Sequence, residues 1–376
     1  MKIAILGMGK IGSGVYEYAM DMDTIAVVRT FDIKKWMDDM TTDIDDIVND
    51  PEIELVVETM GGVNPTKEYA LKCINAGKHY VTANKQLVSE AIEELLDAAK
   101  KNNVCLMFGA ACGGGIPYLK NLYNAQNADK ITAVGGILNG TTNYILDRMQ
   151  TEGLDYEQAL TSAQALGYAE KDPASDVDGL DAQRKLILAC AVAWGLAPKA
   201  EDIPVSGIRH IKPIDIKYFK ETGRVARLIA SADKTEAGVS ASVEVHLFRE
   251  DASECAIHKN VNFAWYEGQR SGRFSFSGQG AGKYPTAVNV IQDVLSIMKG
   301  DGRMLKEDTV IAKASAERER CFYIRVKDHE FEAIEKIAKA VKREDGYVLS
   351  ETIPVKTEEM HAMMKNMCGA FFAAIE

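Results

Sequence analysis

The sequence predicts an α/β protein with a doubly wound parallel sheet, an inserted α+β domain and a short C-terminal α+β unit. Over the first 110 residues, short β-branched runs alternate with helical stretches, which is typical of βαβ units. From residue 130 onward, longer helical stretches and separate strand-like segments replace this rhythm. With 376 residues, the chain is also too long for a single compact core.

The expected elements of the first domain follow from the positions of its apolar runs. Strands are expected over residues 2–6, 24–29, 53–58, 79–83 and 103–108. Helices are expected between them over about 11–21, 65–76 and 89–101. A glycine-rich loop over residues 109–115 then precedes a helix that starts near residue 116.

The remaining chain predicts the other two regions. The inserted domain is expected to contain a strand over 131–138, an Asn-Gly turn at 139–140, a long helical region to residue 194 and a strand over 239–245. The helix over 285–298 is amphipathic, so we expect it to cover the first domain. The C-terminal unit is expected to contain strands over 322–326, 347–353 and 370–375 and helices over 330–341 and 358–367. We therefore expect a first domain at 1–129 with about 284–315, an inserted domain at 130–283 and a C-terminal unit at 318–376.

The composition excludes several classes of protein. A net charge of −11 argues against nucleic acid and anionic membranes as partners, because both select a basic surface. The seven cysteines form no CxxC pair, which indicates reduced thiols in a cytoplasmic protein rather than disulfides or a zinc site. We expect no signal peptide, because a strand-like run begins at Lys2. No apolar run approaches the roughly 20 residues that span a membrane.

The segment Gly7-Met8-Gly9-Lys10-Ile11-Gly12 predicts a dinucleotide-binding loop. It follows the first strand and opens the first helix. There, glycines allow a sharp turn, a close approach to a pyrophosphate and tight packing of the helix on the strand. The N–H groups at the start of that helix would then face the phosphates. The alternative is a glycine-rich turn that binds no ligand.

Arg29 favours NADP over NAD. The second strand of an NAD site usually ends in an acid that holds the ribose 2′-hydroxyl, whereas the expected strand here ends in Arg29, three residues before Asp32. A guanidinium at that place suits a 2′-phosphate. The alternative is an arginine that only caps the strand end, and NAD is then possible.

Lys85 and Thr59 lie where a ligand is expected in such a sheet. Lys85 follows the fourth strand in the segment Thr82-Ala83-Asn84-Lys85, and Thr59 follows the third strand. Because the carboxyl ends of parallel strands form the ligand crevice, both side chains are candidates for contact with cofactor or substrate. On spacing alone, a solvent-exposed loop lysine explains Lys85 better.

Asp181 and Lys185 form the most informative pair in the chain. They lie one helical turn apart at the start of a helix that is apolar nearly all round, so their side chains share one face. An acid and an amine are costly to bury there unless they are paired or used in chemistry. The alternative is an ion pair on a solvated first turn.

Cys112 is a candidate thiol nucleophile, because it lies in the loop Ala-Ala-Cys-Gly-Gly-Gly. No histidine lies near it in sequence to activate the thiol. The flanking glycines suit the exposure of backbone carbonyls better, and this is what we expect of the loop.

Several segments closely resemble the homoserine dehydrogenase family. They are GMGKIG at 7–12, VTANK at 81–85, GGGIP at 113–117, GILNGTTNYIL at 136–146, GYAEKDP at 167–173, DVDGLDAQRKL at 176–186 and GAGKYPTA at 280–287. The likeness runs in order from residue 1 to about residue 300. The segments at 136–146 and 167–186 are far more specific to that family than the nucleotide fingerprint is.

The resemblance implies an enzyme of threonine and methionine biosynthesis that interconverts L-homoserine and L-aspartate 4-semialdehyde with NADP or NAD. It implies a Rossmann-like domain and a homodimer or higher homo-oligomer. It implies that Lys185 is the acid/base at the reacting oxygen, that Glu170 and Asp181 hold homoserine, and that Lys85 lies beside the nicotinamide. The implied cofactor contacts are Gly7, Gly9, Lys10, Ile11, Gly12, Thr59, Ala83, Gly167 and Gly280.

Two features depart from the family. Its members often carry a glutamate at the position of Gly109, which helps to bind a monovalent cation. With glycine there, the backbone carbonyls of Cys112, Gly114 and Ile116 are expected to remain for the cation. The C-terminal unit resembles a reduced ACT domain, but it reads Lys-Asp-His-Glu at 327–330 where an Asp-x-Pro-Gly turn is usual. Feedback control by threonine is therefore not supported.

Two other functions stay open at this point. One is a dehydrogenase for another small amino-alcohol, against which Glu170 and Asp181 argue because together they suit a substrate that bears an ammonium group. The other is an inactive paralogue that binds NADP or senses an amino acid. Gly109 and the unusual tail suggest it, and the intact Lys85, Asp181 and Lys185 oppose it.

Overall fold

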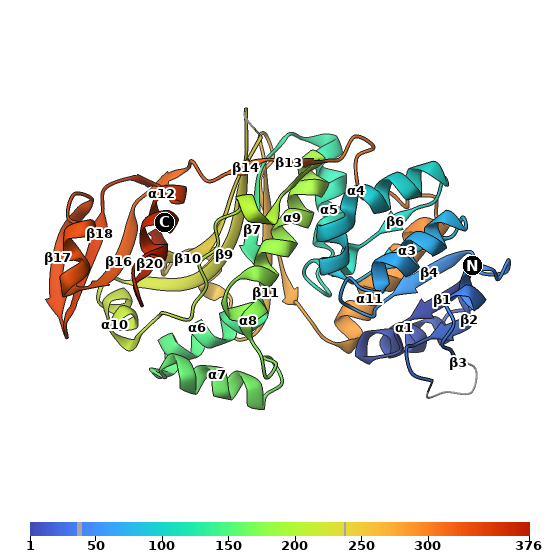
Figure 1. Cartoon of the computed structure of the whole chain (residues 1–376), viewed down its shortest axis with the longest axis horizontal. Helices are drawn as coiled ribbons and strands as arrows, with labels where there is room; N and C mark the ends of the chain where they lie inside the picture. The colour runs from blue at the N-terminus through green and yellow to red at the C-terminus, as the bar shows by residue number, and fades with distance from the viewer. Residues whose placement is uncertain (36–39, 237) are drawn as a thin grey trace. The chain divides into compact units, whose positions relative to one another are not determined.

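The computed structural model describes residues 1–35, 40–236 and 238–376 (Figure 1). The chain forms two compact units, each built from several segments. The first unit comprises Met1–Thr132, Ile187–Ala197 and Trp265–Ile311, and the second comprises Ala133–Leu186, Pro198–Ala264 and Ala312–Glu376. The finer division into three domains stays a prediction.

The first unit contains a parallel sheet with the strand order β3-β2-β1-β4-β5-β6. Its strands are β1 (Lys2–Leu6), β2 (Ala26–Phe31), β3 (Met40–Thr41), β4 (Leu55–Glu58), β5 (His79–Thr82) and β6 (Leu106–Met107). The order steps outward from β1 in both directions, which confirms the doubly wound, Rossmann-like fold class. The boundaries expected for the second strand, 24–29, are wrong, because β2 begins and ends two residues later.

Helices connect these strands, and one more helix joins the unit from far along the chain. They are α1 (Lys10–Met20), α2 (Asp45–Val48), α3 (Thr66–Asn75), α4 (Lys85–Lys101), α5 (Tyr118–Ala128) and α11 (Lys283–Met298). Helix α11 packs against α1: Lys283 Nζ lies 2.6 Å from Glu17 Oε1, and the Tyr18 and Tyr284 rings meet edge to face at 5.9 Å. Helix α4 begins earlier than expected, at Lys85 rather than near residue 89.

A second, mixed sheet has the strand order β12-β11-β7-β9-β10-β20-β16-β18-β17, with β14 beside β10. Its strands are β7 (Ile131–Ile137), β9 (Arg224–Thr235), β10 (Gly238–Arg249), β11 (Val261–Gly268), β12 (Gly272–Gln279), β14 (Ala314–Ser315), β16 (Phe322–Lys327), β17 (Ala338–Glu344), β18 (Tyr347–Thr352) and β20 (Phe371–Ile375). Two small pairs lie outside it, β8 (Leu196–Pro198) with β13 (Val310–Ala312) and β15 (Glu319–Arg320) with β19 (Val355–Lys356). Because β20 pairs with both β10 and β16, the C-terminal strands continue the sheet of the second unit.

The helix expected over residues 330–341 is wrong. The chain there forms a short 3-10 turn, Asp328–Ala333, followed by strand β17. β17 pairs with β18 through a two-residue turn at Asp345-Gly346, where φ is +51° and +77°. Asp-Gly between two strands is a strong hairpin signal, so this dipeptide could have predicted the hairpin. The likeness of this region to an ACT domain stays a prediction.

The helices of the second unit include the one that carries the acid–amine pair. They are α6 (Gly140–Glu152), α7 (Tyr156–Ala165), α8 (Ala174–Val177), the start of α9 (Leu180–Trp194), α10 (Pro213–Glu221) and α12 (Thr357–Lys365); the residues of α9 from Ile187 onward belong to the first unit. The Asn-Gly pair at 139–140 is not a turn, as expected, but the start of α6: Asn139 Oδ1 accepts the N–H of Thr142 at 2.8 Å and caps the helix. No helix among the described residues is long and apolar enough to cross a membrane.

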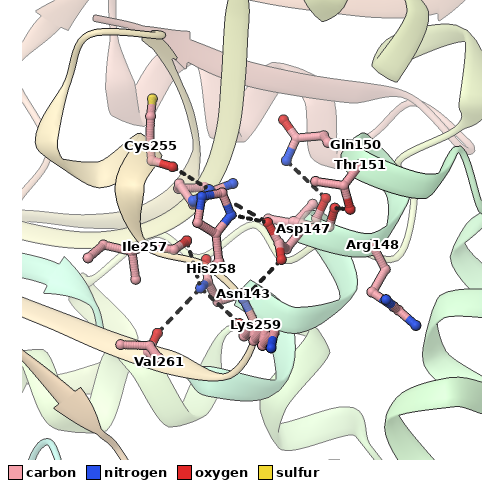
Figure 2. A network of polar contacts seen from close by, with 12 residues as sticks. Asn143, Asp147, Arg148, Gln150, Thr151, Cys255, Ile257, His258, Lys259 and Val261 are labelled. Atoms are coloured by element: carbon pink, nitrogen blue, oxygen red, sulfur yellow. Dashed lines mark hydrogen bonds and ion pairs between the residues drawn. The ribbon is translucent and has the colours of Figure 1, made fainter.

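A buried polar network fixes α6 within the second unit (Figure 2). Asn143 Nδ2 donates at 3.0–3.3 Å to three backbone carbonyls, those of Ile257, Lys259 and Val261. Asp147, one turn further on, accepts the N–H of Lys259 at 2.9 Å and lies 2.8 Å from His258 Nδ1. These bonds hold the helix and the segment before β11 together, and they therefore also hold the helix start at Asn139.

Candidate active site

The loop Gly7–Gly12 is closed on its inner side and open on its outer side. A methyl group added to Gly12 would overlap the carbonyl oxygen of Gly7, whereas one added to Gly9 would meet no atom within 4 Å. Gly7 has φ +86° and donates its N–H to the Phe31 carbonyl at 2.8 Å. Among the residues that the structure describes, no side chain caps the start of α1. The loop thus has the shape for close backbone approach to a pyrophosphate.

Thr59, which follows β4, braces this loop, and Glu58, the last residue of β4, holds the segment after β4 and the end of β5. Thr59 Oγ1 donates to the carbonyl oxygen of Gly7 at 2.6 Å. Glu58 is fully buried and accepts the N–H of Met60 and the hydroxyl of Thr82, each at 2.6 Å. Burial raises the pKa of Glu58, although these hydrogen bonds oppose the shift. Glu58 was not predicted as a site residue, although an acid at the end of an apolar strand was a signal for it.

Lys85 is the first residue of α4, and its side chain is half-buried. Asn84 fixes this helix start, because its Oδ1 accepts the N–H of Leu87 at 3.1 Å and its Nδ2 donates to the Gly62 carbonyl at 2.6 Å. Ala83 lies between β5 and this cap. Because β1, β4 and β5 are parallel neighbours, Lys85 lies at the same edge of the sheet as the loop at residue 7.

Arg29 does not end β2; the strand continues to Phe31, and Asp32 follows it. Arg29 Nη2 lies 3.6 Å from Asp50 Oδ2. Asp32 Oδ2, in contrast, accepts the N–H of Met8 in the glycine loop at 2.9 Å. An acid directly after the second strand is the group that holds the ribose 2′-hydroxyl in NAD sites. The geometry therefore favours Asp32 over Arg29 as the residue that faces the ribose.

Side chains of α11 close the second glycine-rich loop, over residues 109–116. Asn289 Nδ2 donates to the carbonyl oxygens of Gly114 and Ile116, at 2.7 and 3.2 Å. Asp293 Oδ2 accepts the N–H of Gly109 at 2.7 Å. Burial raises the pKa of Asp293 to about 7, although the N–H of Gly109 opposes the shift.

Two of the three carbonyls expected to hold a monovalent cation are thus already engaged. Those of Gly114 and Ile116 both accept an N–H from Asn289, so a cation that bridges the two oxygens does not fit beside it. The third expected ligand, Cys112, is buried. Gly114 approaches Gly280 so closely that an added methyl group would overlap the Gly280 carbonyl. Within residues 1–35, 40–236 and 238–376, no group of three or more His, Cys, Asp or Glu side chains could hold a metal ion.

Asp181 and Lys185 form a buried ion pair at the start of α9. Lys185 Nζ lies 2.8 Å from Asp181 Oδ2, and the two side chains are 8% and 3% exposed. The alternative of an ion pair on a solvated turn is therefore wrong. Nζ also donates to the Leu138 carbonyl at 2.6 Å. Two of the three ammonium protons thus have acceptors among the described residues, which leaves one direction for a ligand oxygen.

Asn139 joins this pair to a second carboxylate. Its Nδ2 donates to Asp181 Oδ2 at 2.8 Å and to Asp176 Oδ1 at 2.7 Å. The Leu138 carbonyl, which Lys185 contacts, also accepts Asn262 Nδ2 at 2.9 Å. These partners of the pair were not predicted, although Leu138 and Asn139 lie in the family-specific segment at 136–146.

Glu170 and Gly167 lie on an exposed loop between α7 and α8. The loop is tied to the start of α6, because Thr141 Oγ1 donates to the Tyr168 carbonyl at 2.6 Å. Of the expected substrate residues, the structure brings together Asp181 and Lys185 and leaves Glu170 exposed.

Two family models match most of the chain. The model described as "Homoserine dehydrogenase, NAD binding domain" matches residues 7–109. The model described as "Homoserine dehydrogenase" matches residues 117–295.

Whole proteins with the same description are similar as well. The homoserine dehydrogenase of Synechocystis sp. is 39% identical over 317 residues, which cover 79% of this chain and 73% of that protein. That of Bacillus subtilis is 36% identical over 316 residues, which cover 80% and 73%. The crystal structure of a homoserine dehydrogenase from Thiobacillus denitrificans has a TM-score of 0.89 at 28% identity and covers 100% of this chain and 98% of that one. The chain belongs to the homoserine dehydrogenase family, whose members are NAD(P)-dependent oxidoreductases.

Proposed function

We propose that this chain catalyses the NAD(P)-dependent interconversion of L-homoserine and L-aspartate 4-semialdehyde. The observation that carries the proposal is the buried Asp181–Lys185 pair in a chain of this family. Burying an amine and an acid costs free energy, so their retention at the mouth of an apolar helix needs a reason. Acid–base chemistry at a substrate oxygen supplies that reason.

Lys185 is the proposed proton carrier. When bound, NAD(P) exchanges a hydride with the substrate carbon that bears the oxygen. In reduction, the ammonium of Lys185 donates a proton to the aldehyde oxygen, which becomes the hydroxyl group. In oxidation, the neutral amine of Lys185 takes the hydroxyl proton. Asp181 and the Leu138 carbonyl hold two N–H bonds of Lys185, and this directs the third toward the substrate.

Substrate and cofactor contacts extend the proposal to other residues. We assign Glu170, on its exposed loop, to the ammonium group of homoserine, and Lys85, at the start of α4, to the nicotinamide side of the site. The open side of the first glycine loop supports cofactor contacts there. Besides Lys85, the residues that we propose contact the cofactor are Gly7, Gly9, Lys10, Ile11, Gly12, Thr59, Ala83, Gly167 and Gly280.

The test is the formation of NADH and NADPH by the purified protein with L-homoserine. L-serine and L-threonine serve as control amino-alcohols, and Lys185→Ala serves as the control enzyme. We expect turnover with L-homoserine far above either control. Binding of NADPH without turnover would identify a sensor instead, and faster turnover of a control substrate would identify a different dehydrogenase.

We also propose that the protein acts in the cytoplasm as a homodimer. All seven cysteines are free thiols, which suits a reducing compartment. Strand β12 forms one edge of the second sheet, and its Phe274 side chain is exposed, which suits contact with a second copy. Light scattering of the purified protein tests the assembly; a monomer at micromolar concentration would contradict it.

A further inference from the structure

Two polar side chains of α11, Asn289 and Asp293, lie one helical turn apart and contact the same glycine-rich loop. Each residue is only 2% exposed. Buried polar side chains are kept where backbone groups would otherwise lack partners. Helix α11 therefore supplies hydrogen-bond partners for the loop over residues 109–116.

The carbonyl oxygens of Gly114 and Ile116 converge on one nitrogen atom, Asn289 Nδ2. Backbone carbonyls that converge in this way also form cation sites, in which their oxygens replace the hydration shell of the ion. An amide NH₂ group presents two partly positive hydrogens to the same oxygens. The amide therefore gives the two carbonyl oxygens a hydrogen-bond donor without a net charge. A net charge would be costly to bury there.

The side chains of Asn289 and Asp293 occupy the space that a side chain at position 109 would enter. A methyl group added to Gly109 would lie 2.9 Å from Asp293 Oδ1 and 3.1 Å from Asn289 Oδ1. A longer side chain at position 109 would therefore displace the carboxylate of Asp293 and the amide of Asn289 from their present places. The glycine at 109 and the asparagine on α11 form one steric arrangement, in which the helix fills the space beneath the loop.

We propose that Asn289 is a positioning residue whose side-chain amide takes the place of the monovalent cation that the family resemblance implies. The loop then keeps its shape with no bound cation. The inference rests on the proposed function only in that this loop serves NAD(P)-dependent catalysis. The hydrogen bonds of Asn289 are observed independently of any activity.

The test compares thermal unfolding and turnover in NaCl, KCl and choline chloride at equal ionic strength. We expect the wild-type protein to show the same Tm and the same turnover in all three salts. Asn289→Asp replaces the amide by a carboxylate that faces two carbonyl oxygens, so it creates a need for a cation. We expect its Tm to fall by about 5 °C or more in choline chloride and to recover with Na⁺ or K⁺.

A second variant and a matched control keep the test independent of one substitution. Gly109→Glu combined with Asn289→Ala restores a carboxylate to the loop and removes the amide, and it should also acquire a Na⁺- or K⁺-dependent Tm. Gln292→Ala changes an exposed residue of the same helix and should behave like the wild type in every salt.

Two results would overturn the inference. One is a wild-type Tm or turnover that rises specifically with Na⁺ or K⁺. The other is an Asn289→Asp protein that is destabilised equally in all three salts, because Asn289 would then be only a structural residue. Since Tm is measured without substrate, absent turnover with the expected salt pattern would contradict the proposed function and support this inference.

Discussion

Two buried acid–base pairs lie in the second unit, and they differ in how completely their charges are enclosed. Arg325 Nε lies 2.8 Å from Asp215 Oδ1, and both side chains are fully buried. The other guanidinium nitrogens donate to the carbonyls of Gly369 and His210, at 2.9 and 2.5 Å. Each nitrogen of the Arg325 guanidinium thus has an acceptor, and neither side chain of that pair is exposed. The Lys185 side chain, in contrast, is 8% exposed and has acceptors for two of its three protons among the described residues. The fully buried pair suits a structural task, and the pair that a ligand can still reach suits chemistry.

Asp215 shows what full enclosure costs. It accepts further hydrogen bonds, at 2.7 Å each, from the Tyr323 hydroxyl and the Lys212 N–H. Burial nevertheless raises the pKa of Asp215, although the Arg325 guanidinium beside it opposes the shift. Desolvation thus outweighs attraction at this carboxyl. Removing one partner of such a pair lowers the stability of the fold, because the other charge is then buried alone.

The largest expected effect separates the two pairs by activity. Lys185→Ala should lower turnover by about 10³-fold, because general acid–base catalysis is lost. NADP affinity should stay near the wild-type value, because the side chain acts on the substrate oxygen and not on the pyrophosphate. Steady-state kinetics and NADP titration provide the measurement. Arg184→Ala, next in the chain and partly exposed, is the control; wild-type turnover in Lys185→Ala would remove this residue from the mechanism.

For the buried pair of Asp215 and Arg325, we expect a loss of stability rather than a loss of turnover. Arg325→Met should lower the free energy of unfolding by about 3–5 kcal/mol, because Asp215 is left buried without its partner. The protein that remains folded should keep a near-normal kcat. Urea unfolding and active-site-normalised kinetics measure both quantities. The exposed pair of Arg343 and Asp328 offers the control Arg343→Met, which should change stability little. If Arg325→Met kept its stability but lost turnover, the Asp215–Arg325 pair would have a role in activity and not in stability.

A third buried acid of the second unit extends the comparison to pH. Glu244 is fully buried and lies 3.0 Å from His246 Nε2 and 2.9 Å from His361 Nε2. Burial alone raises the pKa of Glu244, but the hydrogen bonds of the two histidines outweigh it and hold the pKa below the usual range. A carboxyl with a lowered folded-state pKa contributes stability above its unfolded pKa of about 4.3, and this stability is lost as the pH falls further.

The free energy of unfolding should therefore decline below about pH 4.5 in the wild type. Glu244→Gln should be less stable at neutral pH and should show a smaller decline in acid, because its amide does not titrate. Urea unfolding between neutral and acidic pH measures both slopes. Equal acid slopes in the two proteins would show that Glu244 does not carry this dependence.

The smallest expected effect concerns an acid and a base of the first unit, Asp32 and Arg29. Asp32→Ala should raise the ratio of NADP to NAD efficiency about tenfold, because a carboxylate beside the ribose repels a 2′-phosphate. Arg29→Ala should change this ratio little, because Arg29 pairs with Asp50. Values of kcat/KM with both cofactors give the ratios. A selective loss of NADP efficiency in Arg29→Ala would restore the sequence-based assignment.

The parallel sheet and the acid–amine pair could be predicted because each depends on local pattern. Short apolar runs between helices mark β1, β4 and β5 almost to the residue. The four-residue spacing of Asp181 and Lys185 places them together on any helix. These features need no knowledge of distant parts of the chain.

The features that were missed depend on contacts between distant segments. Asn289 lies 175 residues from Gly114 in sequence, and nothing near either residue marks the pair. Residues 338–344 have helix-compatible side chains, and pairing with β18 decides that they form a strand. The extension of β2 beyond Arg29 likewise depends on its pairing with β1, where Phe31 is opposite Leu6.

The cap of α6 has a consequence for the chemical ageing of this protein. Asn139 precedes Gly140, the sequence context in which an asparagine amide most readily loses ammonia through a cyclic imide formed with the next backbone nitrogen. The buried helix start holds that amide in hydrogen bonds with Asp176, Asp181 and Thr142 and keeps it from the ring-closing geometry. An unfolded or overheated chain has no such protection. An aspartate formed there could still cap the helix on refolding, but it would present a third carboxylate to Asp176 and Asp181 in place of a donor.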